Sequence, residues 1–512
     1  MIYASRIKLI ILLVFLLLFN VYSTVQKTAP LNTEAEKEKL IAHLERVIPE
    51  LMKKAEIPGM SIAVIKDGEI IWSDGFGIKS VKTGEVVTKE TIFEAASLTK
   101  PFFAYAAMKL VEGGELDLDK PLVEYVSEDY LVKEYIRHPM DLEGFRSDWF
   151  RRITARMVLS HSSGLPHGGP RKPLPIHFEP GTQYRYSADG YMYLQRVMEH
   201  LKGESLTEIM REMAIEPLEM TNSSMVWQDR YETQSAVGHD VMSETNGRFR
   251  KRRAPHAAAT LYTTAEDYAR FVAAVMNDEG LKTATIEEML TPQIDVDKDV
   301  FWGLGFGLEE TPNGKAYWQW GDYGIFRNYI VAYKEKKIGV VYLTNSFNGL
   351  SIGADVVKNA IGGGDDLGLT YLNYARYDSP TMQIVGVAKD KEVEEVVSIF
   401  QKLRKEHPDN FKESDINSLG YFLVNAGRIP AAIEIFKINA ETYPNSANVY
   451  DSLAEAYMNN GDTDLAIKYY RKALETVPKD TTTDKDLLER IKQGAAERLK
   501  ELEAKKQEKK KI

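Results

Sequence analysis

The sequence has 512 residues, and 65 Lys and Arg against 75 Asp and Glu leave a formal net charge of −10. Hydrophobic residues make up 44% of the chain, enough to fill a core, which excludes a disordered protein. The acidic balance argues against a nucleic-acid partner, because phosphates attract basic surfaces. The absence of cysteine excludes thiol nucleophiles, disulfides and cysteine-ligated zinc. We therefore expect a globular enzyme or binding protein that uses oxygen and nitrogen chemistry.

Residues 1–23 have the pattern of a signal peptide. Arg6 and Lys8 precede an apolar run over 9–19, and small residues follow near Ser23. As a helix this run would rise ~16 Å, about half of a ~30 Å bilayer core. We predict cleavage near Ser23 and a periplasmic or secreted protein. The alternative is an uncleaved anchor, which would be the membrane contact of the chain.

The next segments predict a helix, a hairpin and a second helix. Residues 34–54 carry apolar residues at helical spacing, and two alternating runs then flank Asp67 and Gly68. An Asp-Gly pair between alternating runs predicts a tight hairpin, because both turn positions need φ > 0. A further helix is expected from Ser97 to about Gly113.

The following part alternates short helices and loops up to about residue 260. Thr263 and Thr264 precede Glu266 and Asp267 by three residues, which predicts a capping-box start for a helix there. Antiparallel strands joined by tight turns are expected over residues 302–310, 315–324, 327–337 and 338–345, with a helix near 351–361. Strands at both ends of the region 34–362 predict an α+β domain with one antiparallel sheet and helices.

Residues 363–380 cluster glycines without a period and are predicted to be a linker. Residues 381–512 then predict an all-α repeat domain, because five positions recur at a period of 34 and resemble tetratricopeptide repeats. The matching pairs are Leu419 and Leu453, Gly427 and Gly461, Ala432 and Ala466, Phe436 and Tyr470, and Pro444 and Pro478. Helices over 391–405 and 484–503 are expected to cap them. The alternative is two ordinary amphipathic helix pairs.

The sharpest chemical motif pairs Ser97 with Lys100, which stand one above the other on a helix face. Pro101 lacks an N–H and is tolerated only in the first turn, so the helix begins near Ser97. This start places the Ser97 hydroxyl and N–H at the positive end of the helix dipole, where an oxyanion is stabilised. A buried lysine one turn away can act as base toward the serine. The bare spacing also fits a serine N-cap beside a solvated lysine.

The sequence resembles the serine β-lactamase and penicillin-binding family, in its class C-like esterase and peptidase branch. The resemblance lies in the residues around Ser97, in the N-terminal helix and hairpin, and in the two motifs described next. The resemblance covers about residues 35–362. It implies Ser97 as nucleophile and Lys100 as its partner. Tyr186 matches the tyrosine of the family's Tyr-x-Asn motif and would shuttle the proton. Which of Lys100 and Tyr186 is the base stays open.

A third family motif, Lys-Thr-Gly or His-x-Gly, is matched by Gln319, Trp320 and Gly321. The resemblance implies a substrate-binding strand there, with the backbone N–H groups of Asp322 and Ser97 as the oxyanion hole. Gly321 also fits a bulge or a packing position.

Two residues depart from the family pattern. Ala188 stands in place of Asn, and Gln319 stands in place of Lys or His. A lost charge-assisted hydrogen bond costs ~1.5–3 kcal/mol, so recognition of β-lactams should suffer while acylation does not. An ester or peptide substrate is therefore favoured.

The loop over residues 159–166 matches a loop common in this branch, and His161 is expected to orient it rather than catalyse. The nine histidines form no metal-binding motif, so neither a metal nor another cofactor is expected.

The resulting hypothesis is an exported serine hydrolase that forms an acyl-enzyme with a small-molecule or peptide substrate, and whose repeats offer a surface to a protein partner. The same-class alternative is a β-lactamase or D-Ala carboxypeptidase. The alternative from another class is a catalytically idle scaffold that binds cell-wall fragments or a partner. The presence of Ser97, Lys100 and Tyr186 together favours the enzyme.

Overall fold

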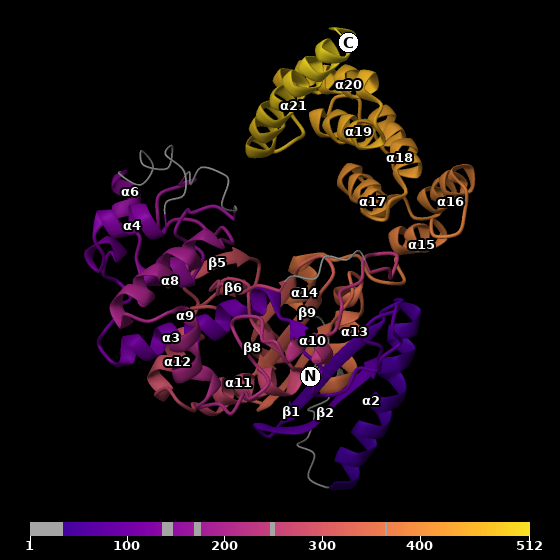
Figure 1. Cartoon of the computed structure of the whole chain (residues 1–512). Coiled ribbons are helices and arrows are strands. Elements are labelled where there is room, and N and C mark those ends of the chain that lie inside the picture. Colours follow the sequence, from indigo (N-terminus) through magenta and orange to yellow (C-terminus); the bar gives the residue numbers. More distant parts are fainter. Residues whose placement is uncertain (1–33, 136–146, 168–175, 246–250, 364–365, 512) are drawn as a thin grey trace, which may run out of the picture. The chain divides into compact units, whose positions relative to one another are not determined.

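The computed structural model describes residues 34–135, 147–167, 176–245, 251–363 and 366–511 (Figure 1). The predicted signal peptide lies outside these ranges. Among the helices that are described, none combines the length and the apolar character needed to cross a membrane.

The first described elements follow the predicted order. Helix α2 (Glu34–Lys54) leads to a hairpin of β1 (Gly59–Lys66) and β2 (Glu69–Gly77). Asp67 and Gly68 at its turn have φ of 53° and 80°, the left-handed values that a two-residue hairpin turn requires. The predicted hairpin is confirmed.

One antiparallel sheet of eight strands forms the centre of the domain, in the order β2-β1-β10-β9-β8-β7-β6-β5. Strand β1 pairs with β10, with Ala63 opposite Val341, so strands from the two ends of the domain lie side by side, next to the edge strand β2. The predicted run 302–310 forms two strands, because the chain turns back where the Gly303 N–H donates to the Phe306 carbonyl. The strands not yet bounded are β5 (Ile294–Asp297), β6 (Val300–Trp302), β7 (Gly307–Thr311), β8 (Gly314–Asp322), β9 (Arg327–Tyr333) and β10 (Ile338–Thr344).

Helices cover this sheet and complete the α+β fold. Helix α11 (Ala265–Asn277) packs across β1, β2, β9 and β10. Of the two predicted threonines, Thr264 is the N-cap, and its hydroxyl accepts a hydrogen bond from the Asp267 N–H at 3.1 Å. The remaining elements are β3 (Phe93–Glu94), α3 (Thr99–Glu112), α4 (Glu128–Glu134), α6 (Asp148–Arg151), α7 (Ala155–Leu159), α8 (Asp189–Lys202), α9 (Leu206–Met210), α10 (Tyr231–Gln234), β4 (Tyr262–Thr263), α12 (Thr283–Met289) and α13 (Gly353–Ile361).

The C-terminal part is all helical and shows the predicted period. Helices α17 (Glu413–Asn425) and α19 (Ala447–Asn460) begin 34 residues apart, as do α18 (Ile429–Thr442) and α20 (Thr463–Thr476). The paired glycines, Gly427 and Gly461, both have positive φ, at 71° and 86°, where each first helix ends. Further helices are α14 (Leu367–Leu372), α15 (Pro380–Val387), α16 (Val393–Glu406) and α21 (Lys485–Lys511).

We predict that the repeats unfold as a unit separate from the α+β domain, because they have a hydrophobic register of their own. Leu453→Ala removes a side chain that is 1% exposed, which typically costs about 2–5 kcal/mol. Differential scanning calorimetry should show two transitions, of which only one moves down by several degrees. Leu465→Ala, at a site 37% exposed in the next helix, is the control and should move neither transition. A single transition that shifts as a whole would contradict separate folding.

Candidate active site

Ser97 lies in a tight turn that feeds helix α3. A 3₁₀ turn over Ala96–Leu98 precedes α3, and Ala96 has φ of 50°, a conformation that L-residues rarely adopt. The Thr99 hydroxyl fixes this turn, because it donates to the Ala96 carbonyl at 2.6 Å and accepts from the Leu261 N–H at 3.0 Å. Pro101 falls in the first turn of α3, so the helix starts where the sequence predicts.

Lys100 is buried directly beside the serine. Its Nζ donates to Ser97 Oγ at 3.0 Å and to the Ala258 carbonyl at 3.0 Å, and only 1% of the residue is exposed. The same atom lies 4.6 Å from the centre of the Tyr186 ring. Burial lowers the pKa of Lys100 to about 7, because an ammonium loses its hydration there. A substantial fraction of Lys100 is therefore a neutral amine at neutral pH.

Tyr186 is held by Gln319 rather than by a cation. The Gln319 Nε2 donates to the Tyr186 hydroxyl at 2.9 Å and to the Ser97 carbonyl at 3.1 Å. Burial raises the pKa of Tyr186, although hydrogen bonds from Ser97 and Gln319 act in the opposite direction. The phenol therefore stays protonated, and Lys100 is the better base of the pair.

Strand β8 lies against the serine turn at Gly321. A Cβ on Gly321 would come within 2.2 Å of the Ala95 carbonyl oxygen, so only glycine allows this approach. The Trp320 ring, one residue earlier, lies 4.6 Å from that of Tyr186. This packing explains Gly321 without a substrate. Two roles stay predictions. One is substrate binding by Gln319, Trp320 and Gly321, and the other is oxyanion binding by the N–H groups of Ser97 and Asp322.

His161 lies beneath Tyr186 and holds the chain on both sides of it. Its carbonyl accepts from the Arg185 N–H at 2.8 Å, and its Nδ1 accepts from the Ser187 N–H at 3.0 Å. The imidazole and phenol rings are 4.2 Å apart. Burial, and then the charge of Lys100, lower the pKa of His161, so it stays neutral. These contacts fit the expected orienting role.

Two contacts of the site have no signal in the sequence. The Ala258 carbonyl that holds Lys100 is a backbone group, which any residue type would supply. The amide of Gln319 was expected to meet substrate, yet its Nε2 is engaged with Tyr186 and Ser97. In the part of the chain that the structure describes, no group of three or more His, Asp or Glu could hold a metal ion.

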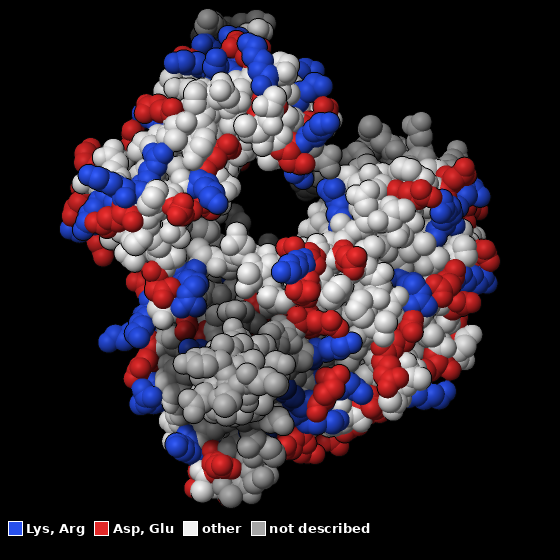
Figure 2. Space-filling view, turned by 180° about the vertical axis from the view of Figure 1, so that it is seen from behind, with Lys and Arg blue, Asp and Glu red and all other residues white. Residues whose placement is uncertain are grey.

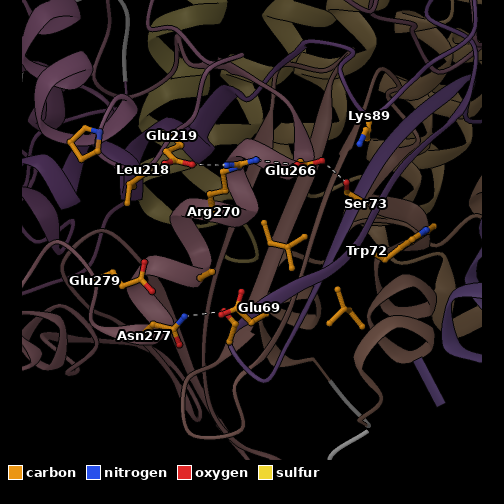
Figure 3. A pocket seen from close by; sticks show the side chains of 15 residues that line it. Glu69, Trp72, Ser73, Lys89, Leu218, Glu219, Glu266, Arg270, Asn277 and Glu279 are labelled. Carbon is orange, nitrogen blue, oxygen red and sulfur yellow. Dashed lines mark hydrogen bonds and ion pairs between the residues drawn. The ribbon is translucent and has the colours of Figure 1, made fainter. Parts of the chain in front are cut away.

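A separate cavity of about 740 Å³ lies between β2, α11 and the residues around Leu218 (Figure 3). Two of the carboxylates that line it are paired with Arg270. Arg270 bridges Glu266 at 3.2 Å and Glu219 at 3.5 Å, and the Ser73 hydroxyl donates to Glu266 at 2.6 Å. Ser73 thus has a carboxylate neighbour, a weak base, whereas Ser97 has a buried amine. Ser97 is therefore the better candidate nucleophile of the two serines.

Charges of both signs are interspersed over the face of the molecule seen in Figure 2, where Lys and Arg alternate with Asp and Glu. The expectation of no nucleic-acid partner rests on the acidic balance of the whole chain.

Curated relatives share part of the hydrolase-like region. The chain is 27% identical over 269 residues to the unguisins hydrolase of Aspergillus violaceofuscus, covering 46% of this chain and 45% of that protein. It is 24% identical over 214 residues to Protein flp of Staphylococcus aureus, covering 40% of this chain and 42% of that protein. The chain thus spans less than half the length of these relatives.

The fold is shared with a solved class C β-lactamase, at a TM-score of 0.54 and 20% identity, over 64% of this chain and 98% of that one. A tetratricopeptide-repeat profile matches residues 447–480, which are α19, α20 and the turn that follows. The β-lactamase profile matches residues 44–358, more than half of the sequence. The protein therefore belongs to the β-lactamase family and carries a helical region with a tetratricopeptide repeat at its C-terminal side.

Proposed function

We propose that this protein is a serine hydrolase that cleaves an ester or amide bond through an acyl-enzyme. The observation that carries the proposal is the 3.0 Å contact between Ser97 Oγ and the Nζ of a buried lysine whose pKa lies at about 7. A serine is a weak nucleophile unless an adjacent base removes its proton, and neutral Lys100 is such a base.

In this mechanism the Ala258 carbonyl accepts one N–H of the neutral Lys100, which leaves the amine lone pair for the Ser97 hydroxyl. Ser97 Oγ attacks the acyl carbon as its proton moves to Lys100 Nζ. The backbone N–H groups of Ser97 and Asp322 bind the oxyanion. Tyr186 protonates the leaving group and recovers a proton from Lys100. Water then attacks the ester of Ser97, and the same groups return the proton to Oγ.

The neutral surroundings of the serine favour an ester or peptide substrate over a β-lactam. Gln319 offers no positive charge to a substrate carboxylate, and its Nε2 is occupied by Tyr186. Ala188 offers no amide to an acylamino group. The relative named an unguisins hydrolase supports hydrolysis as the reaction class. A β-lactamase or D-Ala carboxypeptidase is the second candidate, supported by the shared fold with a class C β-lactamase.

Two further parts of the proposal concern location and partners. Export rests on the basic and apolar pattern of residues 1–23. A protein partner at the C-terminal helices rests on the matched repeat, since such repeats stack into extended binding surfaces. An idle scaffold is disfavoured, because the buried Lys100 would then carry a desolvation cost with no use.

Ser97→Ala should abolish covalent labelling by a fluorophosphonate and lower ester turnover at least ~10³-fold, because the nucleophile is lost. Intact-mass analysis measures the labelling. Ser414→Ala, at an exposed serine of the helical region, is the matched control and should keep full stoichiometry. A Ser97→Ala protein that still gains one phosphonyl group would assign the nucleophile to another residue.

The pH profile should report the titration of Lys100. kcat/KM for a neutral ester should rise as the pH passes about 7 and level off above it, because only the unprotonated amine accepts the serine proton. Gln319→Lys adds a cation near Lys100 and should move this rise to lower pH by about one unit. Gln319→Leu, which adds no charge, should lower the rate without moving the rise. A rate that does not change with pH around neutrality contradicts Lys100 as base.

Ala188→Asn should shift the preference toward penicillins. The new amide can hold an acylamino group, a hydrogen bond worth ~1–2 kcal/mol, or about tenfold in the ratio of penicillin acylation to ester kcat/KM. Stopped-flow acylation and steady-state ester hydrolysis supply the ratio. Ala188→Val, which adds bulk without an amide, should not raise it. Efficient penicillin hydrolysis by the wild type would instead support the β-lactamase alternative.

A further inference from the structure

A short helix beyond the matched family region packs on the catalytic sheet. The β-lactamase match ends at residue 358, and α13 ends at Ile361. Helix α14 follows and contacts β6 and β7. The segment that was predicted as a linker from its glycines therefore makes contacts of its own with the sheet that carries the site.

Close packing and hydrogen bonds fix α14 in place. A Cβ on Gly368 would lie 2.6 Å from the Trp318 ring, so the backbone of α14 rests directly on this indole. The Gly368 N–H donates to Glu309 at 2.8 Å, and the Tyr329 hydroxyl donates to Asp366 at 2.8 Å. The chain that leaves α14 consequently starts from a fixed point beside β8.

Tyr374, two residues after α14, reaches the end of β8. Its hydroxyl donates to Asp322 Oδ2 at 2.6 Å. Arg327 pairs with the same oxygen at 3.1 Å, and its guanidinium lies 4.7 Å from the centre of the Tyr374 ring. Burial, and then the charge of Asp322, raise the pKa of Tyr374, so the hydroxyl stays protonated and remains a donor.

The Tyr374 side chain also lies near Trp320, the residue that precedes Gly321 in β8. Against the larger effects of burial and Asp322, the polar influence of the Trp320 side chain lowers the pKa of Tyr374, so the two side chains are neighbours. The Trp320 ring in turn lies 4.6 Å from that of Tyr186. One side chain thus joins Asp322, whose backbone N–H is the proposed oxyanion donor, to Trp320, which packs on the proposed proton shuttle.

We infer that Tyr374 is a positioning residue for the hydrolase site. Tyr374 contacts the side chains of Asp322 and Trp320 and so fixes the end of β8. This keeps the Asp322 N–H in place for the oxyanion and the Trp320 ring in place against Tyr186. Small misplacements of such groups lower the rate of the chemical step rather than the affinity for substrate. This inference rests on the proposed function.

The test compares Tyr374→Phe, which removes one oxygen, with Tyr377→Phe in the same segment, where the ring packs near Arg376. Steady-state hydrolysis of 4-nitrophenyl butyrate by the full chain gives kcat and KM separately. Tyr374→Phe should lower kcat about tenfold and leave KM within about twofold. Tyr377→Phe should match the wild type in both constants. A purely structural role would lower the melting temperature and leave kcat of the folded enzyme unchanged.

A double-mutant cycle tests whether Tyr374 acts through Asp322. Asp322→Asn weakens the same contact from the other side and should also lower kcat. The double variant should lose clearly less than the product of the two single effects, because both changes remove the contact between Tyr374 and Asp322, while Asp322→Asn also weakens the ion pair with Arg327. Effects on kcat that multiply in the double variant would overturn the inference. If Tyr374→Phe does not fold, Asp322→Asn alone decides, and an unchanged kcat there overturns it.

Fluorophosphonate labelling separates this inference from the proposed function. A wild type that is labelled at Ser97, with an unchanged kcat in Tyr374→Phe, would overturn only the role of Tyr374. A wild type that is not labelled would overturn the proposed function and this inference with it.

Discussion

The burial of one amine, Lys100, is the constraint on which the site depends. An ammonium in this position loses its hydration, and its nearest partners are a hydroxyl, a carbonyl and aromatic rings rather than a carboxylate. Since no full negative charge among these contacts compensates the lost water, the neutral amine becomes accessible near pH 7. The turn at Ser97 places a hydroxyl beside this amine, and the packing of Tyr186 places a phenol ring there. Neither group carries a negative charge that would stabilise the ammonium.

Gln319 adds no charge near Lys100, at a position where the family pattern has a cation. A second positive group near Tyr186 would lower the pKa of the phenol and make it a competitor for the role of base. The amide instead donates one hydrogen bond to the phenol and one to the Ser97 carbonyl, so it orients both catalytic groups while adding no charge. In the proposed function, this single neutral residue leaves Lys100 as the base and selects against anionic substrates.

The first residues after the matched family region still pack against the sheet. Helix α14 rests on Trp318 through Gly368, and Tyr374 then bonds to the end of β8. The helical repeats begin only after this segment, and they follow a period that belongs to a different fold. The residues between two recognisable domains therefore contribute to the packing of the first one.

Local patterns in the sequence determined the hairpin at Asp67 and Gly68, the start of α3 within two residues before Pro101, and the period of the repeats. Each depends on backbone rules that act within a few residues or at a fixed spacing. Tertiary structure alone decided that the Gln319 amide would meet Tyr186, 133 residues away, and that Tyr374 would meet Asp322, 52 residues away. It also decided that the Lys100 amine is desolvated, because desolvation depends on every atom packed around it, and no short stretch of sequence contains that information.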